Sequence, residues 1–128
     1  MPIDNSMSVL IVDDYKTMLR IIRNLLRQIA FYNVQEANDG AEALARLRAG
    51  RFGLVISDWN MEPMTGLQLL REVRTDTHLQ TTPFIMMTAE SKTENVVAAK
   101  QAGVSSYIVK PFNADILRGK IEKVLGHG

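Results

Sequence analysis

The sequence contains no cysteine, and this absence removes two classes of structure at once. Neither a disulfide framework nor a thiolate metal site is possible without cysteine. No apolar run approaches the roughly 20 residues that a membrane-spanning helix needs. An excess of one charge is also lacking: the formal net charge is +1, whereas a nucleic-acid-binding face needs a concentration of basic residues. We therefore expect a cytoplasmic protein that has neither a membrane nor a nucleic acid as its partner.

The N-terminus lacks the features of a signal peptide, because MPIDNSMS has neither a basic start nor an apolar stretch. We expect residues 1–7 to form a disordered lead-in and residues 8–126 to form one domain. The chain of 128 residues is long enough to bury one full hydrophobic core.

What is present is an alternation of short apolar runs with longer segments of helical period. The predicted strands are Val9–Val12, Val34–Glu36, Leu54–Ser57, Phe84–Met87 and Tyr107–Val109. The predicted helices are Tyr15–Ala30, Asp39–Arg48, Thr65–Thr75, Ser91–Ala102 and Asn113–Leu125. Such an alternation predicts a doubly wound α/β fold, in which helices cover both faces of a parallel sheet.

Residues suited to capping stand at most of the expected helix ends, where backbone groups need partners. The expected capping boxes are Thr65 with Gln68 and Ser91 with Glu94. Asp39 and Asn113 are expected N-caps, and Gly50 and Gly103 are expected to end helices. In the first helix, apolar residues at steps of four, three and four predict one buried face. The members of that face are Met18, Ile22, Leu25 and Ile29.

Polar side chains follow four of the five predicted strands directly. In the stretch GLVISDWNMEP, residues 53–63, an apolar run stops at Asp58. The residues that follow the other three strands are Asp13 with Asp14, Thr88, and Lys110. In open parallel sheets, ligands bind at the carboxyl ends of the strands. We therefore expect these side chains to lie together in one crevice.

Three carboxylates in one crevice repel each other unless a cation lies among them. Mg²⁺ suits such a site, because it binds through one or two carboxylates and completes its shell with water and phosphate oxygens. The hydroxyl of Thr88 and the ammonium of Lys110 suit a phosphoryl group, whose transfer depends on positioning and charge neutralisation. Asp58 is then the expected nucleophile, and its product is an acyl phosphate. Each residue alone has an ordinary structural explanation, as a turn, cap or loop residue, but their conjunction favours chemistry.

In their order along the chain, these residues resemble the receiver domains of two-component response regulators, and among them the single-domain, CheY-like chemotaxis receivers. The matching motifs are VDD at 12–14, RNLLR at 23–27, ISDWNM at 56–61, MTAE at 87–90, EN at 94–95 and QAGVSSYIVKPF at 101–112. They span nearly the whole chain after residue 8. The resemblance implies a flavodoxin-like (βα)5 fold with five parallel strands in the order 2-1-3-4-5.

The resemblance also implies a role for each residue at the strand ends. Asp58 corresponds to the phosphoacceptor. The implied Mg²⁺ ligands are Asp13, Asp14, Asp58 and the backbone carbonyl of Asn60.

The remaining family positions concern the phosphoryl group and the response to it. Thr88 and Lys110 are implied to hold phosphoryl oxygens, and the Lys110–Pro111 peptide is expected to be cis. Tyr107 matches an aromatic switch. When phosphorylation draws Thr88 inward, the Tyr107 ring turns in and reshapes the face made by helix four, strand five and helix five. A core aromatic with an exposed hydroxyl is the alternative for Tyr107.

One departure from the family pattern lies four residues after Asp58. The family has proline at this position, whereas this chain has Glu62 followed by Pro63. We expect Glu62 to be either a carboxylate that alters Mg²⁺ affinity or phosphate lifetime, or a solvated loop acid. Glu90 is a second candidate modulator. Thr65, in place of the family's aspartate, exchanges one helix cap for another.

The first helix carries a basic stripe, made of Lys16, Arg20, Arg23 and Arg27. Such a stripe is usually a solvated helix face. In this family the first helix commonly docks a histidine kinase or a histidine phosphotransfer domain, and the stripe could steer an acidic partner. We expect a monomer without an output domain, whose target is the flagellar motor switch. A phosphate sink or a relay intermediate is the alternative.

Three other classes share parts of this pattern. An aspartyl-nucleophile Mg²⁺ phosphatase needs an acid two residues after the nucleophile, where this chain has Asn60. A flavodoxin-type flavin module needs a phosphate loop after the first strand, where this chain has Asp13, Asp14 and Tyr15. A degenerate receiver would have no reason to keep its acids and lysine. We therefore expect a receiver that takes part in its own phosphorylation and is not otherwise an enzyme.

Overall fold

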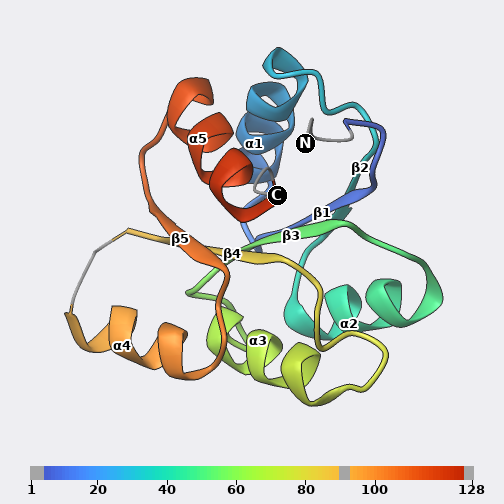
Figure 1. Ribbon diagram of the computed structural model, residues 1–128, viewed down its shortest axis with the longest axis vertical. Helices are drawn as coiled ribbons and strands as arrows, with labels where there is room; N and C mark the ends of the chain where they lie inside the picture. Colours follow the sequence, from blue (N-terminus) through green and yellow to red (C-terminus); the bar gives the residue numbers. More distant parts are fainter. Residues whose placement is uncertain (1–4, 90–92, 126–128) are drawn as a thin grey trace.

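The chain folds into one parallel sheet with helices on both faces (Figure 1). The computed structural model describes residues 5–89 and 93–125. The strands are β1 Val9–Val12, β2 Val34–Ala37, β3 Leu54–Asp58, β4 Phe84–Thr88 and β5 Ser106–Val109. The helices are α1 Lys16–Gln28, α2 Gly40–Ala49, α3 Gly66–Thr75, α4 Thr93–Gln101 and α5 Ala114–Leu125. The strand order is β2-β1-β3-β4-β5, and all neighbours are parallel, so the predicted fold is confirmed.

The strands agree with the predicted ranges to within one residue at each end. Asp58 and Thr88 were predicted to follow their strands, and they are instead the last residues of β3 and β4. Both still pair within the sheet, Asp58 opposite Met87 and Thr88 opposite Val109. The two side chains are therefore fixed by the sheet itself and not by a loop.

The predicted helix caps are present wherever the structure describes them. The Asp39 side chain accepts a 2.8 Å hydrogen bond from the Glu42 backbone N–H. Thr65 and Gln68 form the expected capping box, in which each side chain accepts from the other residue's backbone N–H. Gly103, just after α4, has a φ of +90° that favours glycine. The expected box of Ser91 with Glu94 is not seen, because Ser91 lies outside the described residues.

The buried face of α1 differs from the predicted one. Its fully buried residues are Leu19, Ile22 and Leu26. Met18 and Leu25 are only half-buried and pack at the border of the same cluster. Apolar residues at adjacent positions allow two overlapping buried faces. The helix turns the face that contains Leu19 and Leu26 toward the sheet, and not the one that contains Met18 and Leu25. The predictions of Ile22 and of Ile29, which follows the last helical residue, are confirmed, because both are buried in the first cluster. Within the helix, Leu19 and Leu26 take the places predicted for Met18 and Leu25.

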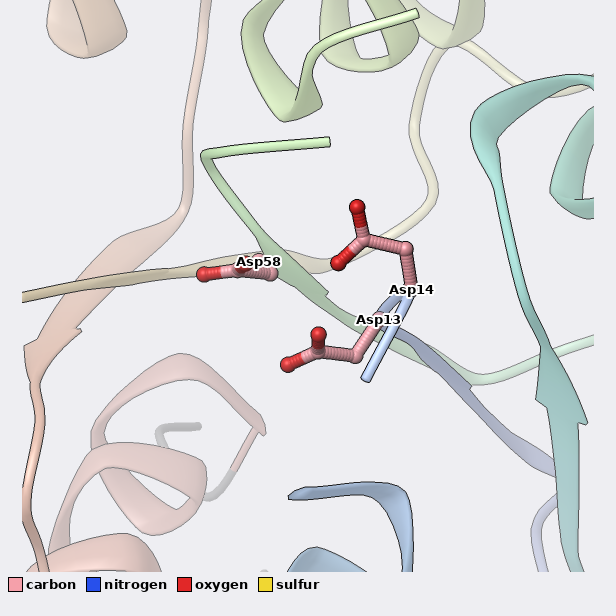
Figure 2. Close-up of side chains that lie close together, drawn as sticks. All are labelled: Asp13, Asp14 and Asp58. Carbon is pink, nitrogen blue, oxygen red and sulfur yellow. The ribbon is translucent and has the colours of Figure 1, made fainter. Parts of the chain in front are cut away.

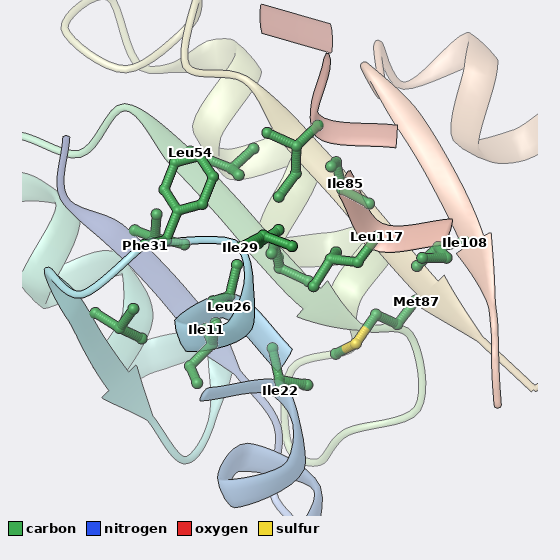
Figure 3. Packing of buried hydrophobic residues seen from close by; sticks show 14 of the residues in the cluster. Ile11, Ile22, Leu26, Ile29, Phe31, Leu54, Ile85, Met87, Ile108 and Leu117 are labelled. Atoms are coloured by element: carbon green, nitrogen blue, oxygen red, sulfur yellow. The ribbon is translucent and has the colours of Figure 1, made fainter. Parts of the chain in front are cut away.

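Two hydrophobic clusters cover the two faces of the sheet. Figure 3 shows the first, in which Ile11, Ile85 and Ile108 of the sheet pack against α1 and α5, through residues such as Ile22 and Leu117. The second lies under α2 and α3. Neighbouring residues of a strand point to opposite faces of the sheet. Because helices cover both faces, successive strand residues are apolar. This packing sets the positions of the strands, and with them the positions of the residues at their carboxyl ends.

Residues 5–7 of the expected lead-in contact the domain. Asn5 donates a 3.0 Å hydrogen bond from its side chain to the Ile29 carbonyl, and Asn33 donates to the Ser6 carbonyl. Met7 packs against the first cluster. Within the described parts of the chain, no helix combines the length and the apolar character needed to cross a bilayer.

Candidate functional site: an acidic cluster at the carboxyl ends of the strands

Three carboxylates lie together at the carboxyl ends of β1 and β3 (Figure 2). One oxygen from each of Asp13, Asp14 and Asp58 lies within 4.8 Å of the other two. Asp13 and Asp58 are 1% and 5% exposed, whereas Asp14 is exposed. The cluster forms because β1 and β3 are parallel neighbours, with Val12 opposite Ser57. The three acids that the sequence placed in one crevice are therefore found together.

Asp13 is the least satisfied of the three. Its Oδ1 accepts a 3.0 Å hydrogen bond from the Tyr15 backbone N–H. Its Oδ2 is buried and has no hydrogen-bond partner among the residues that the structure describes. Burial, followed by the charge of Asp58, raises the pKa of Asp13 to about 6, although the Tyr15 hydrogen bond opposes this shift. A buried oxygen without a partner, inside a group of three acids, fits a hard divalent cation such as Mg²⁺.

Lys110 supplies the positive charge of the site. Its Nζ lies 2.9 Å from Asp58 Oδ1, and the Lys110 side chain is mostly buried. The Lys110 backbone N–H donates a 2.8 Å hydrogen bond to the Thr88 carbonyl, which ties the residue to β4. The Lys110–Pro111 peptide is cis, as expected. The ammonium is thus fixed at the carboxylate that the sequence identifies as the nucleophile.

Gly66 is a feature of the site that the sequence reading did not explain. A Cβ at Gly66 would collide with the backbone carbonyl oxygen of Asp58 and lie 2.8 Å from Met86 Sδ. The Gly66 backbone N–H donates a 2.9 Å hydrogen bond to the Trp59 carbonyl. The start of α3 therefore packs directly on the backbone of Asp58, and only glycine leaves room for this. A glycine after the loop that follows β3 was the available signal.

Thr88 and Tyr107 border one small cavity between α4 and the sheet. The cavity has a volume of about 10 Å³, and its other lining residues are Trp59, Met86, Asn95, Val96 and Ala99. Thr88 is buried and Tyr107 is half-buried. Lys120 of α5, which sequence reasoning missed, holds its Nζ 5.3 Å from the centre of the Tyr107 ring. The ring thus lies between a cationic contact and a cavity that also reaches Thr88.

Of the two candidate modulators, only Glu62 lies among the residues that the structure describes. Glu62 is exposed and does not belong to the group of three carboxylates, and the Glu62–Pro63 peptide is cis. Glu90 lies outside the described residues. The exposure of Glu62 agrees with a solvated loop acid, and its effect on Mg²⁺ or phosphate stays a prediction.

The basic stripe of α1 is not uniform. Lys16, Arg20 and Arg27 are exposed, but Arg23 is half-buried. Arg23 Nε lies 2.9 Å from Glu36 Oε2 on β2. Three of the four charges are therefore accessible, while the fourth links the helix to the edge strand.

The comparisons with known proteins agree with this fold. The chain matches the family model described as the response regulator receiver domain over residues 9–122, and it belongs to that family. It is 52% identical over 118 residues to the chemotaxis protein CheY of Pseudomonas aeruginosa, an alignment that covers 92% of this chain and 95% of the relative. It is 49% identical over 122 residues to the chemotaxis protein CheY-3 of Vibrio cholerae, and this covers 95% of this chain and 94% of the relative.

Among solved structures, the chemotaxis response regulator CheY4 of Vibrio cholerae superposes with a TM-score of 0.86 at 38% identity. The match covers 94% of this chain and 99% of the other.

Proposed function

We propose that this protein is a stand-alone response regulator of a two-component system that accepts a phosphoryl group on Asp58. The observation that supports this most is the buried Asp58 carboxylate, 2.9 Å from the Lys110 ammonium and within a group of three acids. The phosphoryl donor is a phosphohistidine of a histidine kinase or a histidine phosphotransfer domain. This donor class follows from membership of the receiver family.

The phosphoryl transfer is a displacement at phosphorus. An Asp58 carboxylate oxygen attacks, a P–O bond forms, the donor's P–N bond breaks, and the leaving imidazole takes up a proton. Lys110 moves its hydrogen bond from Asp58 Oδ1 to a phosphoryl oxygen, and Thr88 donates its hydroxyl to another. Hydrolysis of the acyl phosphate, with water attacking phosphorus, later restores Asp58.

The reaction requires a divalent cation for charge neutralisation. Mg²⁺, when bound, offsets the charge of the phosphoryl oxygens and of the carboxylates. The ligands from this chain are Asp13, Asp14, Asp58 and the backbone carbonyl of Asn60. The buried Asp13 Oδ2, which has no partner in the described part of the chain, supports this assignment.

Phosphorylation changes the surface through Thr88 and Tyr107. When the Thr88 hydroxyl turns to the phosphoryl group, it vacates space beside the cavity that both residues line. The Tyr107 ring then moves inward and leaves Lys120. The face of α4, β5 and α5 is thereby reshaped, which is how a local charge becomes a signal for a partner.

The downstream role is chemotaxis, with the flagellar motor switch as the target. Two relatives that are 52% and 49% identical to this chain are named as chemotaxis proteins, and the alignments cover more than nine-tenths of their length. A binding assay with a motor switch protein tests this role. Binding that depends on Asp58 phosphorylation is the expected result. Binding that does not depend on it would contradict the role and leave the phosphate sink or the relay intermediate.

The exposed part of the α1 stripe is the proposed docking surface for the phosphoryl donor. We expect Lys16→Glu with Arg20→Glu to slow phosphotransfer from the cognate donor by about tenfold at low salt, and by less at high salt. The control is Arg71→Glu with Lys123→Glu, two exposed charges on other helices. Equal rates for the two double variants would remove the docking role.

Trp59 gives a direct test of the phosphorylation, because it is the only tryptophan and follows Asp58 in the chain. Its fluorescence is followed while Mg²⁺ and then acetyl phosphate are added. We expect a change with Mg²⁺, then a second, reversible change that Asp58→Asn lacks. No response to Mg²⁺ would contradict the metal site, and a second change retained in Asp58→Asn would contradict the nucleophile.

A further inference from the structure

A second and larger cavity lies at the amino ends of β3 and β4, at the other end of the sheet from Asp58. It has a volume of about 750 Å³, which is within the range of small-molecule sites. Its walls are the last turn of α2 with the residues up to Phe52, and the loop from Asp76 to Pro83. None of the proposed phosphorylation residues lines it.

Positive charge dominates the lining of this cavity. Arg48 and Arg51 carry this charge, and Asp76 is the one acid among the lining residues. Both Asp76 oxygens are engaged: Oδ2 lies 3.2 Å from Arg48 Nε, and Oδ1 accepts a 2.9 Å hydrogen bond from the His78 backbone N–H. These contacts, the His78 hydrogen bond first, lower the pKa of Asp76, so it stays ionised and paired with Arg48.

Arg51 is therefore left as the uncompensated charge. Its side chain is exposed, and it makes no hydrogen bond or ion pair with any residue that the structure describes. A planar guanidinium with free donors binds phosphate or carboxylate oxygens through two parallel hydrogen bonds. The hydroxyls of Thr81 and Thr82 on the facing loop add donors of the same kind.

The rest of the lining is apolar. Leu47 and Leu79 are buried side chains, and Phe52 and Pro83 are half-buried. A site that combines an apolar wall with a few polar groups selects ligands that carry both characters. An inorganic ion would leave the apolar wall uncovered, and a purely apolar molecule would leave Arg51 unpaired.

We propose that this cavity binds a small organic anion, whose apolar body covers Phe52 and Leu79 and whose phosphate or carboxylate group pairs with Arg51. The proposal is independent of phosphorylation on Asp58, because the two sites share no residue. Its failure would leave the phosphorylation untouched.

The test uses phenyl phosphate and benzoate as probes, with phenol and inorganic phosphate as half-ligands. The full ¹⁵N-labelled chain is titrated in EDTA, so that the acidic cluster carries no metal, and amide shifts are followed by NMR. We expect saturable shifts confined to residues 47–53 and 76–83. Phenol and inorganic phosphate should each bind at least about tenfold more weakly than phenyl phosphate. Relative affinities of phenyl phosphate and benzoate then identify the preferred anionic group.

Arg51→Gln is the decisive variant, and it should fold normally because the Arg51 side chain has no partner to lose among the described residues. We expect it to weaken binding of the better probe by at least about tenfold. The matched control is Arg71→Gln, an exposed arginine of α3 outside the cavity, which should bind as the wild type does. Unsaturable shifts, shifts centred on Asp58, or equal binding by Arg51→Gln and wild type would each overturn the proposal.

Discussion

The two ends of the sheet treat charge in opposite ways. At the carboxyl ends, Asp13 is buried, its Oδ2 lacks a partner among the described residues, and its pKa is raised to about 6. At the amino ends, Arg74 is partly buried but well bonded. Its guanidinium donates to the carbonyls of Gly103, Gln80 and Thr82, at 2.8, 3.2 and 2.7 Å.

The difference separates charge that stabilises from charge that waits for a ligand. A buried charged group stabilises a fold only when its hydrogen bonds are complete. Arg74 meets this condition and joins α3 to the loops before β4 and β5. Asp13 does not, so its site costs stability until a cation binds. The buried carboxylate with an incomplete set of partners therefore lies at the end of the sheet where we propose that phosphorylation takes place.

Removing the Arg74 side chain should produce the largest loss of stability. We expect Arg74→Met to lower the free energy of unfolding by about 3 kcal/mol, because three backbone carbonyls lose a charged donor. Urea unfolding measures this. Arg71→Met, one turn earlier on the exposed side of α3, should cost less than about 0.5 kcal/mol. Equal losses for the two variants would break the contrast between the ends.

Asp13→Asn should act in the opposite direction, with a dependence on pH. The folded state holds the Asp13 proton more tightly than the unfolded chain, since the pKa rises from 3.8 to about 6. The penalty from Asp13 therefore grows as the pH rises from 3.8 and is complete above about 6. In EDTA, we expect the variant to gain about 2 kcal/mol more over the wild type at about pH 7.5 than at about pH 4.5.

Added Mg²⁺ supplies the control for Asp13. The wild type should gain stability from the cation at neutral pH, and Asp13→Asn should gain less, because it has lost a ligand or its supporting charge. A wild type that is more stable than the variant in EDTA at neutral pH would contradict the account of the unsatisfied carboxylate.

The smallest effect on stability is expected at Lys120. This variant tests whether a charge near the carboxyl ends of the strands also fixes the Tyr107 ring in place. Lys120→Met keeps most of the aliphatic stem but removes the cation over the Tyr107 ring, so about 0.5–1 kcal/mol of stability should be lost. The Tyr107 ring resonances should shift as well. Lys123→Met, on an exposed position of α5, is the control and should leave those resonances unchanged.

The fold and the acidic cluster could be predicted from the sequence, because both follow from a simple rule. Apolar runs define the strands, and capping residues mark the helices between them. Parallel strands then bring Asp13, Asp58 and Lys110 to the same end of the sheet. Packing details were less accessible. The contact of Lys120 with Tyr107 depends on how α5 is rotated against the sheet.

Loop conformation was the other limit. The cavity beside Arg51 exists because the loop between α3 and β4 is held by Arg74, and neither periodicity nor spacing encodes such a contact. The same holds for Gly66. No side chain fits at this position, because the Gly66 backbone lies against the Asp58 carbonyl across the turn.

The central claim is that Asp58 accepts a phosphoryl group, and mass spectrometry of the intact protein, followed by peptide mapping, tests it most directly. The chain is incubated with acetyl phosphate and Mg²⁺, its intact mass is measured, and the protein is then digested to locate the added group. We predict a gain of one phosphoryl group, located on the peptide that contains Asp58 and absent both from Asp58→Asn and from samples with EDTA. A phosphoryl group on another residue, or none in the wild type with either acetyl phosphate or a phosphorylated histidine kinase, would contradict the account.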